Sequence, residues 1–126
     1  MFNQLTHFDL IVSGAMLFQN LIFLLLQAQE GVSDVKYWRT KGKAEIDFLV
    51  TFGNKVLPIE VKFKDIHNDS LTKSMVTFIK KYKPEKFIVV NKSFDGTRQF
   101  DNTIVKFVTY KALVNKHFVI NELYEN

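Results

Sequence analysis

The chain has 126 residues, of which 47% are hydrophobic and 24% are charged, a composition typical of a globular domain and not of a disordered chain. It contains no cysteine, which excludes a disulfide scaffold, a thiolate zinc site and a cysteine nucleophile. A net charge of +4 permits nucleic-acid binding without requiring it. We expect one domain over residues 1–126, and a cytoplasmic location, because the N-terminus lacks the positively charged segment of a signal peptide.

The first predicted element is a helix from about Asp9 to Gln29, ended by Glu30 and Gly31. It is apolar on nearly every side, but polar residues interrupt it and its flanks lack basic residues, so a buried helix is favoured over a membrane span. Such a helix lies either between two layers of the fold or between two subunits. A homo-oligomer formed through this helix is therefore one hypothesis.

Three strands are predicted next, over residues 35–40, 44–52 and 56–63, from their alternating apolar residues. A second helix is predicted to start at Asn68-Asp69-Ser70 and to end near Tyr82, followed by a short apolar strand over residues 87–91. The remainder is predicted as a polar loop (93–102), a strand (104–109), a helical turn (110–115) and a final strand (118–123). The order α-β-β-β-α-β indicates an α/β fold with helices on both sides of a mixed sheet.

A tight hairpin is predicted at Gly53-Asn54, since a two-residue Gly-Asn link is typical of primed turns. The resulting cross-strand pairs are Phe52–Lys55, Val50–Leu57, Phe48–Ile59, Asp47–Glu60 and Glu45–Lys62. Two directly opposed carboxylates, with Cβ atoms about 4.5–5.5 Å apart, repel each other unless a proton or a cation offsets the charge. The side chain of Lys62 points to the same face as that of Glu60, two residues before it.

Convergence of Asp47, Glu60 and Lys62 on one sheet surface predicts a divalent-metal site. A bound metal can polarise a phosphodiester and activate a water, and a nearby lysine can orient that water or stabilise developing negative charge. The alternative is a solvated sheet face on which Glu45 and Lys62 form an ordinary ion pair.

Two stretches, Glu45–Val50 and Pro58–Lys62, resemble the Asp…Glu-x-Lys signature of the PD-(D/E)XK nucleases. More narrowly, the chain is similar to the uncharacterised domain found C-terminal to AAA-type ATPase modules in bacteria and archaea. The segments Gly14–Asn20, Tyr37–Thr40 and Phe78–Tyr82 carry that similarity, which covers roughly residues 10–92. It implies a restriction-endonuclease-like fold, with a mixed central sheet flanked by helices.

The resemblance implies roles for individual residues. Asp47 and Glu60 would bind Mg²⁺ or Mn²⁺, with the backbone carbonyl of Val61 as a further ligand, and Lys62 would be the catalytic lysine. The family motif usually has a glutamate where this chain has Gln19, and that glutamate supports the metal or its waters. Gln19 keeps a carbonyl acceptor but lacks the charge.

Two functions remain open from the sequence. One is a metal-dependent nuclease-like domain acting on nucleic-acid phosphodiesters. The other is a non-catalytic docking, regulatory or nucleic-acid-binding domain that accompanies an AAA-type ATPase. The chain is not itself a P-loop ATPase, because Gly42-Lys43 has neither the preceding glycine nor the following hydroxyl residue of that motif.

Basic and aromatic residues gather around the first predicted hairpin, namely Lys36, Tyr37, Trp38, Arg39, Lys41 and Lys43. The cations would contact phosphates of DNA or RNA, and the aromatic rings would stack on exposed bases. The alternative is a charged, solvated loop with its aromatic side chains buried in the sheet.

Overall fold

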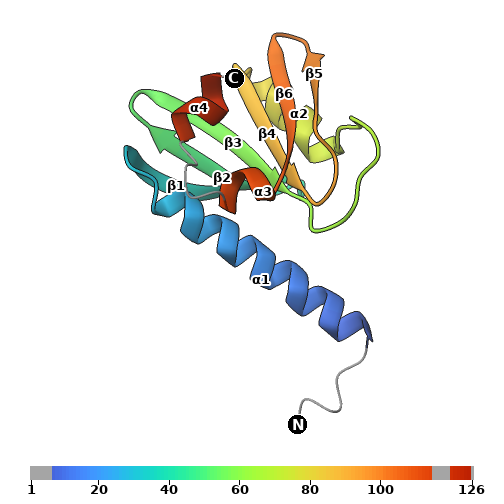
Figure 1. Ribbon diagram of the computed structural model, residues 1–126. Coiled ribbons are helices and arrows are strands. Elements are labelled where there is room, and N and C mark those ends of the chain that lie inside the picture. The colour runs from blue at the N-terminus through green and yellow to red at the C-terminus, as the bar shows by residue number, and fades with distance from the viewer. Residues whose placement is uncertain (1–6, 115–119, 126) are drawn as a thin grey trace.

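A six-stranded mixed sheet, in the order β1-β2-β3-β4-β6-β5, forms the centre of the molecule (Figure 1). The structure is a computed structural model, and it describes residues 7–114 and 120–125. The elements in chain order are α1 (His7–Gln27), β1 (Val32–Arg39), β2 (Glu45–Phe52), β3 (Lys55–Val61), α2 (Lys73–Tyr82), β4 (Lys86–Asn91), β5 (Gly96–Phe100), β6 (Thr103–Thr109), α3 (Lys111–Val114) and α4 (Ile120–Glu125). Strand β4 pairs in parallel with β3 and β6, and the other neighbours are antiparallel. The predicted α/β class, a mixed sheet flanked by helices, is confirmed.

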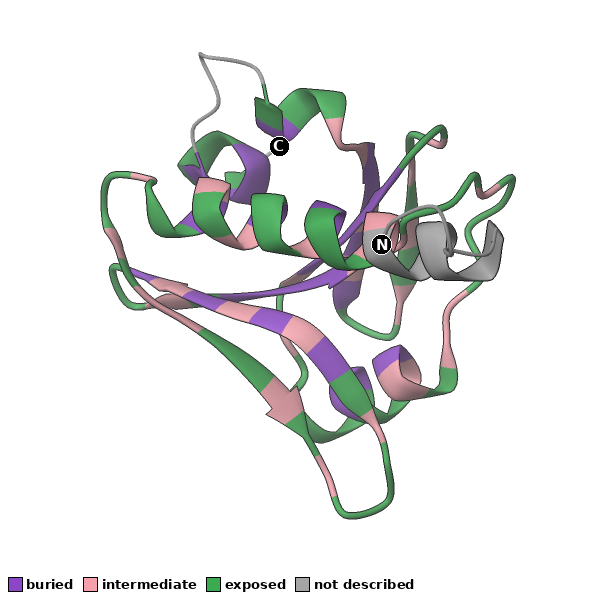
Figure 2. Ribbon diagram, turned by 90° about the horizontal axis from the view of Figure 1, so that it is seen from below, coloured by how far each residue is buried: buried purple, intermediate pink, exposed green. Residues whose placement is uncertain are grey.

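The two faces of the sheet carry separate hydrophobic cores. Helices α1, α3 and α4 cover one face, where Phe18, Ile22 and Leu26 of α1 are buried against the sheet. Helix α2 covers the other face through Met75, Phe78 and Ile79. Figure 2 shows that the described part of α1 buries the side that faces the sheet and leaves its outer side exposed. Within the described residues, no helix is long and apolar enough to cross a membrane.

The predicted hairpin register is confirmed from the turn as far as Phe48–Ile59. Gly53 occupies the turn with φ of +59°, a left-handed conformation that glycine adopts without steric cost. The antiparallel ladder ends at Phe48–Ile59, whereas β3 continues its pairing with β4 as far as Val61–Val90. Strands β2 and β3 therefore diverge at the level of Asp47.

A β-bulge in β2 lies at the same level. The pairs Lys36–Leu49 and Trp38–Ile46 bound a segment in which β2 has one residue more than β1. Such an extra residue reverses the alternation of side chains along a strand. Accordingly, Phe48 lies in the α1-side core and Ile46 in the α2-side core, although they are two residues apart. The alternation of Ile46 and Phe48 in the sequence would place both on one face, and the bulge is the reason that they lie on opposite faces.

Two predicted elements in the C-terminal third were wrong. The loop predicted over residues 93–102 contains strand β5, which pairs with β6 at the edge of the sheet. The strand predicted over residues 118–123 is instead helix α4 from Ile120 onward, while residues 118 and 119 lie outside the described residues. Burial of Ile120, Leu123 and Tyr124 follows helical spacing, which explains why a helix packs better here.

The second helix starts later than predicted. Its N-cap is Thr72, whose side chain accepts a hydrogen bond from the Met75 N–H at 3.2 Å. The predicted start at Asn68 forms a turn, in which Ser70 N–H donates to the Asn68 side chain. Both the turn at Asn68 and the cap at Thr72 satisfy backbone N–H donors, so the run of polar residues does not show which of them starts the helix.

Candidate functional site

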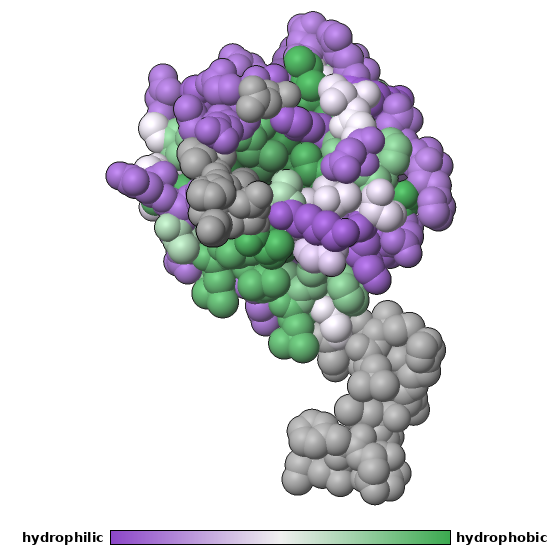
Figure 3. Space-filling view, viewed as in Figure 1, coloured by the Kyte–Doolittle hydropathy of each residue, from purple (hydrophilic) through white to green (hydrophobic). Residues whose placement is uncertain are grey.

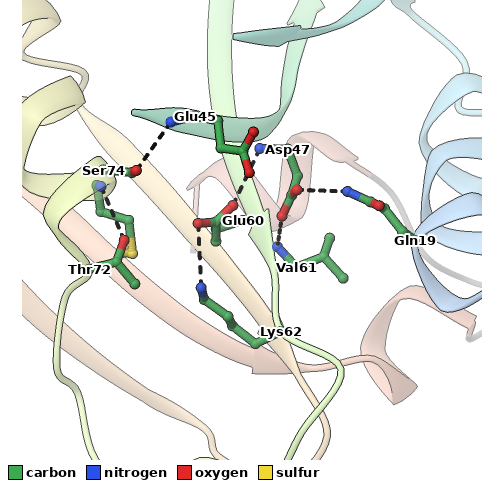
Figure 4. A network of polar contacts seen from close by, with 9 residues as sticks. Gln19, Glu45, Asp47, Glu60, Val61, Lys62, Thr72 and Ser74 are labelled. Carbon is green, nitrogen blue, oxygen red and sulfur yellow. Dashed lines mark hydrogen bonds and ion pairs between the residues drawn. The ribbon is translucent and has the colours of Figure 1, made fainter. Parts of the chain in front are cut away.

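The carboxyl group of Asp47 lies between the diverging strands β2 and β3 (Figure 4). Its Oδ2 accepts a hydrogen bond from the Val61 N–H at 2.8 Å, and its Oδ1 accepts one from Gln19 Nε2 at 2.7 Å. A backbone group of β3 and a side chain of α1 thus hold the two oxygens of Asp47. The divergence of the strands is what gives this carboxyl group access to Val61.

The carboxyl group of Glu60 is buried beside Asp47. Glu60 is 6% exposed, and its Oε1 accepts a hydrogen bond from the Asp47 N–H at 3.3 Å. Its other oxygen lies 3.6 Å from Lys62 Nζ. Burial and the neighbouring Asp47 raise the pKa of Glu60 to about 8, against an opposing effect of Lys62. In the absence of a bound cation, burial and Asp47 therefore favour the protonated form of Glu60.

The predicted pairing of Glu45 with Lys62 was wrong. Glu45 instead pairs with Arg39 across β1 and β2, with Arg39 Nε 3.4 Å from Glu45 Oε2. Lys62 turns to Glu60, because the two strands have separated before this level. The backbone N–H of Glu45 donates to Ser74 Oγ of α2, which ties this end of β2 to the helix below it.

The residue types at this site fit a hard divalent cation. Among the residues that the structure describes, no group of three His, Cys, Asp or Glu side chains is placed to hold a metal. Magnesium nevertheless often binds through one or two carboxylates and keeps several waters. Burial first and Asp47 second raise the pKa of Glu60, and a cation bound here would compete with the proton that this carboxyl group favours. Gln19 turns its amide nitrogen toward Asp47, so it supports that carboxylate as a hydrogen-bond donor.

Comparison with protein families identifies most of the chain. A family model described as a domain of unknown function, DUF4143, matches residues 14–113. The chain belongs to the DUF4143 family. No curated protein matches it. Membership agrees with the expected resemblance to an uncharacterised domain, and the nuclease and ATPase associations stay predictions.

The basic residues predicted to contact nucleic acid are exposed on this DUF4143 domain. Lys36 lies 3.3 Å from Asp34, and the exposed Lys41 and Lys43 lie in the loop between β1 and β2. Trp38, by contrast, packs edge-on against Phe78 and Tyr82 and donates a hydrogen bond from Nε1 to the Tyr82 hydroxyl at 3.3 Å. It therefore belongs to the packing of α2. Tyr37 is the more accessible aromatic residue, with 71% of its surface exposed.

Two adjoining cavities lie near α1 in the DUF4143 domain, and Asp47 lines one of them. A cavity of about 480 Å³ lies between α1 and β1 and is lined by Gln19, Asn20, Phe23, Val35, Lys36, Tyr37 and Phe48; we call it the α1–β1 pocket. A second, of about 380 Å³, is lined by Gln19, Tyr37, Trp38, Arg39, Glu45, Ile46, Asp47 and Phe48. The spacing of apolar residues could not reveal either cavity, because it predicts single elements and not how α1, β1 and β2 pack around a space.

Proposed function

We propose that this domain binds a divalent cation through Asp47 and Glu60 and hydrolyses phosphodiesters of DNA or RNA. The observation that carries the proposal is the meeting of these two carboxyl groups where β2 and β3 diverge, with Lys62 Nζ 3.6 Å from Glu60. A buried carboxyl group with a raised pKa, next to a second carboxylate that lines a cavity, is a physical mark of functional sites.

Each residue has a distinct task in the proposed reaction. Asp47 and Glu60 would hold Mg²⁺ or Mn²⁺, with the Val61 carbonyl as a further ligand. When bound, the metal supplies Lewis-acid polarisation of the phosphodiester and lowers the pKa of a coordinated water. The Lys62 ammonium group orients the attacking water and stabilises negative charge that develops on the phosphate oxygens. Gln19 keeps Asp47 in position through the 2.7 Å hydrogen bond.

A cleavage assay tests the proposal. The wild-type domain is incubated with single-stranded DNA, duplex DNA and RNA in the presence of Mg²⁺ or Mn²⁺, beside Asp47→Asn and Lys62→Ala. Asp69→Asn is the control, because it removes an exposed carboxylate outside the site. We expect cleavage by the wild type and the control and loss of cleavage in both site variants. Equal cleavage by all four proteins would mean that Asp47 and Lys62 are not needed for it, which would overturn the proposal.

A second candidate function is a non-catalytic docking or regulatory domain for an AAA-type ATPase. It is favoured by exposed apolar side chains along the outer side of α1, which we call the α1 stripe: Met16, Leu17, Leu21 and Leu24. Figure 3 shows hydrophobic side chains gathered over the described part of this helix. Such a surface is typical of a site that another protein covers. The presence of Gln19, in place of a third carboxylate, also favours this candidate.

A further inference from the structure

The α1–β1 pocket is connected to Asp47 through shared side chains. Gln19, Tyr37 and Phe48 line both this pocket and the neighbouring cavity that contains Asp47. Gln19 also donates its hydrogen bond to Asp47 Oδ1. A group seated in the pocket therefore lies one side chain away from the site at which a phosphodiester is proposed to react.

The wall of the pocket has the chemistry that recognises a planar heteroaromatic ring. Phe23, Val35 and Phe48 supply apolar surface, and the exposed ring of Tyr37 supplies a face for stacking. The side-chain amides of Gln19 and Asn20 can hydrogen-bond with the edge of a base that is not paired. The volume of about 480 Å³ falls within the range of roughly 300–1,000 Å³ usual for small-ligand pockets.

Positive charge lies beside the same ring. The guanidinium carbon of Arg39 is 5.5 Å from the centroid of the Tyr37 ring, and Lys36 lines the pocket itself. Arg39 also lines the cavity that contains Asp47. Each cation also lies near one exposed carboxylate, Lys36 near Asp34 and Arg39 near Glu45. Because exposed ion pairs are weak, both cations can still contact the phosphates on either side of a stacked base, which is the usual combination in proteins that bind single strands.

We propose that the α1–β1 pocket binds one unpaired nucleobase, so that the polymer recognised by this domain is single-stranded nucleic acid. The placement of the adjoining phosphate at Asp47 rests on the proposed function, whereas the base pocket rests on its own lining. A base inside a duplex cannot enter such a pocket unless it leaves the stack, which costs free energy. Single strands are therefore expected to bind more tightly than duplexes of the same sequence.

Binding measured without metal tests the pocket separately from cleavage. The fluorescence anisotropy of a labelled oligothymidylate is followed in EDTA with the wild type, Tyr37→Ala and Tyr37→Phe. We expect Tyr37→Ala to weaken binding about tenfold, within the range measured for loss of one base–aromatic stack, and Tyr37→Phe to bind like the wild type. Because Tyr37 is 71% exposed, the variants are expected to fold, which circular dichroism checks.

Two further probes give the result that would overturn the inference. The corresponding duplex is expected to bind more weakly than the single strand, and an oligonucleotide of abasic sites is expected to bind the wild type and Tyr37→Ala equally. Equal affinity for single strand and duplex, or no effect of Tyr37→Ala on the oligothymidylate, would overturn the base pocket even if Mg²⁺-dependent cleavage is found. Loss of binding in Tyr37→Ala without any cleavage by the wild type would support the pocket and contradict the proposed nuclease activity.

Discussion

The backbone N–H of Asp47 donates a hydrogen bond to Oε1 of Glu60 at 3.3 Å, at the point where the β2–β3 ladder has ended. This contact brings two carboxyl groups together in a partly buried place, where Lys62 is the neighbouring cation. The protonation of Glu60, the position of Asp47 and the proposed binding of a metal are consequently expected to be coupled. The first two predictions follow from that coupling.

Stability is expected to fall as pH rises. The pKa of Glu60 is raised from 4.5 to about 8 by burial first and by Asp47 second. The folded protein therefore keeps a proton that the unfolded chain has released, so the free energy of unfolding decreases between about pH 4.5 and about pH 8. Below that window Glu60 is protonated in both states. Urea unfolding at pH 5 and pH 8 measures the difference.

Glu60→Gln is the matched variant for this measurement. It keeps the shape of the side chain and cannot ionise, so its free energy of unfolding is expected to vary less between the two pH values than that of the wild type. A saturating concentration of Mg²⁺ should reduce the decrease in the free energy of unfolding of the wild type at pH 8. An unchanged pH dependence in Glu60→Gln would show that other groups are responsible.

The substitution Gln19→Glu tests whether α1 contributes to the site. It replaces the donor to Asp47 Oδ1 by a third carboxylate, so without metal we expect a lower melting temperature from like-charge repulsion. With Mn²⁺ present, the rise in melting temperature should exceed that of the wild type, because an additional oxygen ligand raises affinity. Gln19→Ala removes the hydrogen bond without adding charge, so it should show the lower melting temperature without the larger rise in Mn²⁺. Equal responses of Gln19→Glu and Gln19→Ala to Mn²⁺ would contradict a metal beside Gln19.

The docking hypothesis makes a prediction about the α1 stripe. Leu17 and Leu24 are 69% and 60% exposed, so replacing both by lysine should change the stability of the isolated domain by less than about 1 kcal/mol. If the stripe is covered by a second copy or by an ATPase module, the same change should abolish that association. Light scattering over a range of concentrations detects self-association, and copurification with a coexpressed ATPase detects the other partner. Unaltered association in the double variant would exclude the stripe as the interface.

The start of α2 offers a local test of the fold. Thr72→Ala removes the side chain that accepts the Met75 N–H and should cost about 1 kcal/mol of stability. Thr72→Ser retains the hydroxyl group and should cost less. Thermal unfolding of the two variants makes the comparison, and equal losses would show that the hydroxyl group does not cap the helix.

The hairpin is the part of the site that the sequence predicts best. Gly53-Asn54 determines the turn, the turn determines the register, and the register brings Asp47 to the level of Glu60. The divergence of β2 and β3 is not predictable from that local pattern, because it depends on how each strand pairs with its other neighbour, β2 with β1 and β3 with β4. The same is true of the bulge that sends Ile46 and Phe48 to opposite faces.

The wrong predictions have equally specific causes. Strand β5 (Gly96–Phe100) lies at the edge of the sheet, where alternate residues face solvent and apolar content is low, so its sequence is typical of a loop. The short apolar run before α4 is compatible with a strand or a helix, and only packing of Ile120 and Leu123 against the α1-side core favours the helix. Stacking on a base suits Tyr37 better than Trp38, because Tyr37 is exposed and Trp38 packs against α2. The sequence could not show this, since adjacent strand residues point to opposite faces and the pattern does not say which of them faces solvent.

Isothermal titration of the domain with Mg²⁺ and Mn²⁺ measures whether Asp47 and Glu60 bind a divalent cation. We expect binding by the wild type that increases between pH 6 and pH 8, as Glu60 loses its proton, and that is absent in Asp47→Ala. The titrations are repeated with a short single-stranded oligonucleotide, whose phosphates can complete the coordination. Absence of binding by the wild type under both conditions, or identical binding by wild type and Asp47→Ala, would show that Asp47 and Glu60 do not form a metal site.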